Sequence, residues 1–98
     1  MSEEIERELR EKLLHDAPWE ALEIHWKHQS VFRVKGADLL EVAVAVVADD
    51  KDKVLDWVNR DVLARVSASE AKVWAAQRRT FDAIIVQPWV LIAAPDAS

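Results

Sequence analysis

The sequence contains no cysteine, and this absence removes several kinds of site from consideration. Disulfide bonds, thiolate nucleophiles, iron–sulfur clusters and cysteine-based zinc sites all need the missing side chain. A chain without thiols is compatible with a reducing compartment. We therefore expect a cytoplasmic protein.

Glycine is almost as scarce, because Gly36 is the one glycine among 98 residues. Loops that cradle phosphates use several glycines, since their backbone must approach the phosphate closely or adopt positive φ. The Walker and dinucleotide-binding fingerprints are both absent. Nucleotide binding through either motif is therefore excluded, and we expect no cofactor.

Long apolar runs and basic clusters are also missing. The longest uninterrupted apolar stretch, VAVAVVA at 42–48, is far shorter than the roughly 20 residues of a membrane span. The N-terminal stretch SEEIERELREK is charged throughout and does not resemble a signal peptide. The net charge is −5, and the only local basic group is QRR at 77–79. A surface that follows nucleic acid needs clustered Lys and Arg, so we expect neither a membrane nor a nucleic-acid partner.

What remains is the composition of an ordinary globular domain, with 51% apolar and 32% charged residues. We expect one domain over residues 1–98, with a frayed tail at 95–98. Helices are predicted over 2–15, 16–29, 50–62 and 67–78, where apolar residues recur at helical spacing. Ser67 and Glu70 have the spacing of a capping box at the start of the last helix. The expected fold class is α+β with two layers. Its small, mostly antiparallel sheet has strands near 31–35, 40–48 and 82–93, and about four helices pack on it. The last strand must bulge, break or lie at an edge at Pro88, because proline has no N–H to donate.

The segment at 40–48 allows two interpretations. Valine and alanine alternate with both faces apolar, which is typical of a covered central strand. The alternative is a helix that begins at Asp38, because Asp38 and Glu41 have the spacing of a capping box. Periodicity decides least in such short apolar runs. The density of valine favours the strand, which is the structure we predict.

Three aspartates follow this segment, and they are the strongest local sign of chemistry. Asp49 and Asp50 would lie at the end of a strand, where open sheets bind ligands and where carboxylates could hold Mg²⁺. The other hypothesis is that one of them caps the next helix, with Asp52 in its first turn near the positive end of the helix dipole. We favour the cap. Asp49 and Asp50 remain candidate ligand residues.

Two histidines complete the candidate metal ligands. His25 and His28 are three residues apart on a predicted helix, so both face the same side. Two histidines and an acid could bind zinc, but the sequence lacks the HExxH spacing. Histidines at the surface or at an interface are the favoured interpretation. No metal site is assigned.

The sequence contains five tryptophans, which is an unusually large number for 98 residues. Trp19, Trp26, Trp57 and Trp74 lie on apolar faces of predicted helices, and Trp89 lies in the closing apolar segment. Packing in the core explains them, because each indole buries a large area. A domain of this size has difficulty burying five indoles, and tryptophan is enriched at binding hot spots. We therefore expect one or two of the five at a protein interface.

Two stretches, DLLEVAVAVVADDKDKVLDWV and FDAIIVQPWVLIA, together resemble a family of small bacterial proteins of unknown function, the domain-of-unknown-function family 2288. The shared pattern is an apolar run ending in an acidic pair, two helices that each carry a tryptophan, and a closing PWVL run. Residues 59–61 depart from it, because a glycine-bearing turn is expected there. The resemblance implies a bacterial, cytosolic single domain. It brings no activity and no site residues.

These observations predict a non-enzymatic module that acts through protein–protein contacts, as a homodimer or an adaptor. The tryptophan excess, the small size and the lack of a catalytic motif support this prediction. The alternative is a small-molecule or divalent-metal-dependent activity centred on Asp49 and Asp50.

Overall fold

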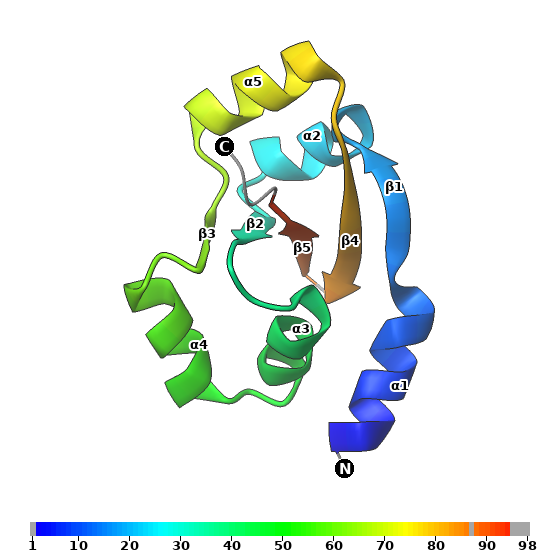
Figure 1. The fold of residues 1–98 in the computed structure, drawn as a ribbon, viewed down its shortest axis with the longest axis vertical. Helices are drawn as coiled ribbons and strands as arrows, with labels where there is room; N and C mark the ends of the chain where they lie inside the picture. The colour runs from blue at the N-terminus through cyan, green and yellow to red at the C-terminus, as the bar shows by residue number, and fades with distance from the viewer. Residues whose placement is uncertain (1, 87, 95–98) are drawn as a thin grey trace.

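The computed structural model describes residues 2–86 and 88–94, so the predicted tail at 95–98 lies outside the described residues. Within them, helices and strands follow one another closely (Figure 1). No helix in this part of the chain has the length and apolar character needed to cross a bilayer. The elements are α1 (Ser2–Lys12), β1 (Leu14–Pro18), α2 (Trp19–Lys27), β2 (Val31–Val34), α3 (Leu39–Val47), α4 (Lys51–Asn59), β3 (Leu63–Arg65), α5 (Ala68–Gln77), β4 (Thr80–Val86) and β5 (Trp89–Ala93).

The five strands form one sheet with the order β1-β4-β5-β2-β3. β2 and β5 are parallel, and every other neighbouring pair is antiparallel. The predicted α+β class with a mostly antiparallel sheet is therefore confirmed. The apolar segment at 82–93 was predicted as one strand interrupted at Pro88, and the structure divides it into β4 and β5. Pro88 lies in the turn between them, as expected for a residue that has no N–H to donate.

The two faces of the sheet each carry a hydrophobic core. Along β5, Leu91 packs with α1, α3 and α4, whereas its neighbours Val90 and Ile92 pack with α2 and α5. Successive strand residues point to opposite faces, so these two groups of helices cover opposite sides. Figure 1 shows α2 and α5 at one end of the molecule and α1, α3 and α4 at the other. Helices therefore lie on both sides of the sheet, where the sequence indicated two layers.

The strand predicted at 40–48 is wrong, because this segment is α3. Asp38 occupies the N-cap position, although its side chain makes no capping hydrogen bond. Val42, Ala43 and Ala45 are buried against the sheet, and the helix is apolar nearly all round. A sequence with apolar residues on every side is equally suited to a buried helix and to a buried strand. Small alanines at the contact allow the helix to approach the sheet closely.

The helix predicted over 2–15 ends at Lys12, and Leu14–Pro18 forms the edge strand β1 instead. β1 pairs antiparallel with β4, and its register shifts between Leu14 and Ala17. Asp16 lies within this irregularity with φ of 57°. A bulge of this kind, with Pro18 at the strand end, is typical of edges that do not add further strands.

Four helices end in a left-handed residue although the chain has almost no glycine. In each case the next amide donates to the carbonyl five residues back, at 2.8 to 3.1 Å, which is the pattern of a Schellman motif. The φ angles of the four residues lie between 51° and 60°. Aspartate tolerates this conformation better than glutamine or arginine does. The left-handed residues are Gln29, Asp49, Asp61 and Arg78.

Candidate functional site

The acidic cluster lies at the junction of α3 and α4, and the structure confirms the predicted cap. Asp50 is the N-cap of α4, and its Oδ1 accepts a hydrogen bond from the Lys53 amide at 3.3 Å. Asp52 lies in the first turn of α4, near the positive end of the helix dipole. Asp49 is the left-handed residue that follows α3. The junction therefore gives each aspartate a structural role.

Two substitutions of Asp50 distinguish a helix cap from a metal ligand at this position. Asp50→Ala should lower the stability by about 1 kcal/mol, or about 4–8 °C in melting temperature, because one amide of α4 loses its acceptor. Asp50→Asn should lie close to the wild type, because asparagine also caps helices. Thermal melts measure both variants. If Mg²⁺, Mn²⁺ or Zn²⁺ raised the melting temperature of the wild type but not of the asparagine variant, Asp50 would be a metal ligand.

The histidines do not lie beside these aspartates. His25 and His28 are exposed and belong to α2 and its C-cap. α2 packs on one face of the sheet, whereas α3 and α4 pack on the other. In the part of the chain that the structure describes, no group of three or more His, Cys, Asp or Glu side chains could hold a metal ion.

The five tryptophans differ sharply in exposure. Trp19, Trp57 and Trp74 are 1%, 7% and 5% exposed, so the folded chain leaves almost no surface of these indoles to a partner. Trp26 is part-buried, and its Nε1 donates to a backbone carbonyl of the β3–α5 connection at 2.8 Å. Trp89 is 38% exposed, more than any of the other four. Of the candidate interface residues, Trp89 offers the most surface.

Trp89 lies in a hollowed apolar surface on the side of the sheet that carries α3 and α4. Its ring packs edge-on against Phe32, with centroids 5.3 Å apart and planes at 82°. The groove beside these rings has a volume of about 240 Å³ and is lined by apolar side chains alone. These are Phe32, Val46, Val54, Val58, Leu63, Trp89 and Leu91.

The hollowed surface extends beyond this groove, where α1 adds the charged side chains of Glu8 and Lys12 to its apolar lining. A second hollow of about 390 Å³ shares Val46 and Trp89 with the first and reaches α1. Val47, which is 47% exposed, lines this second hollow. Val58 is 49% exposed in the wall of the first groove, and Leu55, one helical turn away, is 59% exposed. We call the surface formed by Val47, Leu55, Val58 and Trp89 the Trp89 surface.

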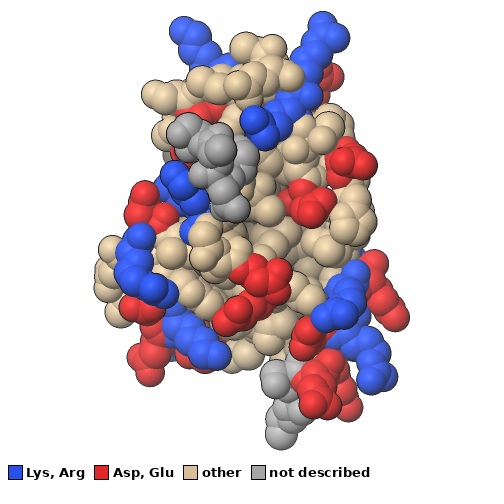
Figure 2. Space-filling model, viewed as in Figure 1, with Lys and Arg blue, Asp and Glu red and all other residues tan. Residues whose placement is uncertain are grey.

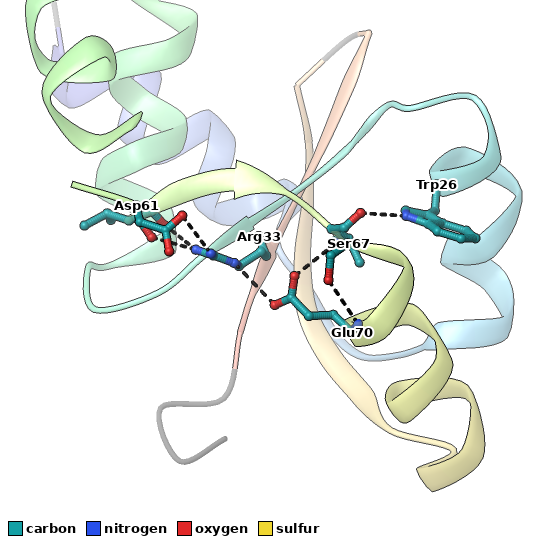
Figure 3. Close-up of polar contacts among 7 residues, drawn as sticks. Trp26, Arg33, Asp61, Ser67 and Glu70 are labelled. Atoms are coloured by element: carbon teal, nitrogen blue, oxygen red, sulfur yellow. Dashed lines mark hydrogen bonds and ion pairs between the residues drawn. The ribbon is translucent and has the colours of Figure 1, made fainter. Parts of the chain in front are cut away.

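The structure also reveals a buried arginine that the sequence reasoning missed. The Arg33 side chain on β2 is 9% exposed. Its Nη1 donates to the Asp61 carbonyl at 2.7 Å, its Nη2 donates to Asp61 Oδ1 at 3.0 Å, and its Nε lies 3.4 Å from Glu70 Oε2 (Figure 3). Strand alternation could have indicated it, because Arg33 lies two residues after the core residue Val31 and shares its face.

The Arg33 network joins three parts of the chain. Asp61 belongs to the connection between α4 and β3, and Glu70 belongs to the first turn of α5 (Figure 3). Glu70 also completes a capping box with Ser67, which confirms the sequence prediction for this helix. These contacts of the guanidinium hold β3 and α5 against β2. We therefore assign the network to stability rather than to chemistry.

A family model and a solved structure both match most of the chain. The model of a family described as "Protein of unknown function (DUF2288)" matches residues 4–94. The chain is also similar to the solution NMR structure of the protein PA1075 from Pseudomonas aeruginosa. That similarity has a TM-score of 0.73 and 30% identity, over 88% of this chain and 80% of the other. No curated protein matches the chain.

Proposed function

The chain belongs to the family described as Protein of unknown function (DUF2288), and we propose that it acts in the bacterial cytoplasm as a non-catalytic module that binds a protein chain through the Trp89 surface. The single observation that carries this proposal is the gathering of exposed apolar side chains around a hollow. Four of the eight exposed large hydrophobics in the described residues belong to this surface. Contiguous apolar surface of this kind is typical of interaction sites, and tryptophan is enriched at their centres.

The size and lining of the groove favour a protein side chain over a small ligand. Sites for small molecules usually measure about 300–1,000 Å³ and carry a few polar groups that orient the ligand. The groove beside Trp89 is smaller, at about 240 Å³, and its lining has no polar side chain. One or two apolar side chains of a partner fit such a groove, whereas a polar metabolite would lose hydrogen bonds to water in it.

The alternative, an activity centred on Asp49 and Asp50, has weaker support. A hollow of about 550 Å³ between α1, α3 and α4 is lined by Glu6, Asp38, Glu41 and Asp50, together with Lys53. Asp49 does not line it, and Asp50 is engaged as the cap of α4. The metal-dependent melts of the Asp50 variants test this alternative directly.

Site-specific photocrosslinking in bacterial cells tests the proposed function. A photoreactive amino acid replaces Val58 in the groove wall, and in a control it replaces Val73 on α5. The two valines are a matched pair, because both are 49% exposed and they lie on opposite sides of the sheet. We expect discrete protein products from position 58 and at most a diffuse background from position 73. Equal patterns from the two positions, or no product from position 58, would contradict the proposal.

A further inference from the structure

We propose that the groove beside Trp89 binds a short acidic segment of a partner protein, with an apolar side chain in the groove and a carboxylate on Arg65. This inference rests on the proposed function and names the chemistry of the partner. It is carried by the size of the Trp89 surface, by the position of Arg65 beside the groove and by the pairing of the nearest acids.

The Trp89 surface is too small for a stable complex with a folded partner. From their exposed fractions, its four side chains present on the order of 300–400 Å². Each partner buries about 800 Å² in a standard interface between folded proteins. A linear segment needs less surface, because its side chains enter pockets and its backbone lies along them. The groove of about 240 Å³ therefore fits an apolar anchor of such a segment.

Arg65 places a positive charge at the rim of this groove. It lies on the edge strand β3, directly opposite Phe32 in the register of β2 and β3. Its guanidinium carbon is 5.9 Å from the centre of the Phe32 ring, which lines the groove and packs against Trp89. The lining of the groove itself contains no charged side chain. A segment that fills the groove and continues past Phe32 therefore meets Arg65.

Arg65 has no acidic partner among the described residues. Its Nη1 donates to Gln29 Oε1 at 3.1 Å, and this contact is exposed. The two acids nearest to it in sequence, Asp61 and Glu70, both pair with Arg33. A guanidinium can hold one carboxylate through two parallel hydrogen bonds, whereas phosphorylated motifs are bound by clusters of arginines. The lone arginine at the rim therefore favours a carboxylate.

The charge of the chain as a whole does not select the partner. Figure 2 shows acidic and basic side chains next to each other over α1 and α4, so no single sign dominates there. Charges more than about 8 Å apart are largely screened at physiological ionic strength. The net charge of −5 consequently opposes an acidic segment only weakly. The cation in direct contact with the segment determines which charge is bound.

The geometry also predicts the spacing of the two side chains in the partner. The Phe32 ring lies between the groove and the guanidinium, which is 5.9 Å from the ring centre. Side chains two residues apart in an extended segment point to the same face and lie roughly 6.6 Å apart. We therefore expect an aspartate or glutamate two residues away from a leucine or aromatic anchor.

Selection from a displayed library of short random peptides tests the inference on the full chain. The wild type should enrich peptides with an acid two residues from an apolar anchor. Arg65→Glu should enrich peptides with lysine or arginine in place of the acid, because the charge at the rim is reversed. Val58→Glu should enrich neither, because it places a charge in the groove wall. Arg79→Glu is the control, because Arg79 also donates to a glutamine at 3.1 Å but follows α5 on the other side of the sheet.

The affinity of an enriched peptide provides a second readout. Fluorescence anisotropy of the labelled peptide should show that Arg65→Gln raises the dissociation constant about tenfold, because a charge-assisted hydrogen bond is lost. An amide in place of the acid of the peptide should weaken binding to the wild type by a similar factor. The same amide should change binding to Arg65→Gln much less, since the two groups interact with each other. Arg65 is exposed, so folding should be retained, and circular dichroism verifies it.

The outcomes separate this inference from the proposed function. Enriched peptides without an acid, or the same peptides on Arg65→Glu as on the wild type, overturn the acidic segment and leave the protein-binding function in place. If no peptide is enriched but photocrosslinking at Val58 gives discrete products, the partner is not a short segment, and this inference alone is overturned. If both experiments give nothing, both proposals are overturned.

Discussion

Replacing Trp19 with alanine is expected to bring the protein close to unfolding. Trp19 is 1% exposed at the start of α2, and it forms an aromatic cluster with Trp26, Trp74 and Phe81 at centroid distances of 5.6 to 6.2 Å. Truncation of a buried tryptophan removes its packing and leaves a cavity, at about 3–5 kcal/mol. Small domains have only about 5–15 kcal/mol of total stability. Thermal melts should show a decrease of at least about 15 °C.

A phenylalanine at the same position sharpens the test. The buried Nε1 of Trp19 has no hydrogen-bond partner among the described residues. Trp19→Phe keeps an aromatic ring in the cluster and removes this unpaired donor, so we expect less than half of the loss seen with alanine. Trp89→Ala is the control on a partly exposed indole, and it should lower the melting temperature much less than Trp19→Ala does. A Trp19→Ala variant that melts within about 3 °C of the wild type would contradict the central role of this cluster.

The second large effect is expected from Arg33→Ala, at about 2–4 kcal/mol. The variant loses three hydrogen bonds from the guanidinium to the α4–β3 connection, its ion pair with Glu70 and the packing of a buried aliphatic stem. The edge strand β3 and the start of α5 both lose their link to β2. Urea unfolding monitored by tryptophan fluorescence measures the change in the free energy of unfolding.

Arg60 provides a matched control for Arg33. Both arginines form an ion pair of about 3 Å, 2.9 Å for Arg60 with Asp56 and 3.0 Å for Arg33 with Asp61. They differ in exposure, because the Arg60 side chain is 61% exposed and that of Arg33 is 9% exposed. Exposed pairs of this spacing contribute only about 0.3–0.5 kcal/mol, so Arg60→Ala should be nearly neutral. Equal losses in the free energy of unfolding of the two variants would show that burial of Arg33 adds nothing to stability.

Asp61 has two roles, because it adopts the left-handed backbone conformation after α4 and it also binds Arg33. The family resemblance indicated a glycine-bearing turn at 59–61, and the structure places Asp61 there with φ of 60°. This left-handed conformation ends α4 and also directs the Asp61 carbonyl and carboxylate towards Arg33 (Figure 3). A glycine would adopt the same backbone conformation without strain, but it would not supply the carboxylate. The aspartate at this position therefore both ends α4 and contributes to the Arg33 network.

Features that depend on a few neighbouring residues were determined by the sequence alone. The capping box of Ser67 and Glu70 and the cap at Asp50 were predicted correctly, because a helix start depends on side chains within three or four positions. The start of α2 near Pro18 and the interruption at Pro88 follow from the missing N–H of proline. The mostly antiparallel α+β class was also predicted correctly, although the predicted sheet included the segment at 40–48, which is a helix.

The tertiary structure decided every feature that depends on distant parts of the chain. The segment at 40–48 is apolar on all sides, so its own residues could not choose between strand and helix, and packing against the sheet made the choice. Arg33 became a clamp only because α4, β3 and α5 bring Asp61 and Glu70 to it. The five tryptophans look alike in sequence, since each lies in an apolar pattern. Trp89 is the most exposed of the five and borders the groove that α3 and α4 line, and only the assembled fold determines how far a helix covers a sheet.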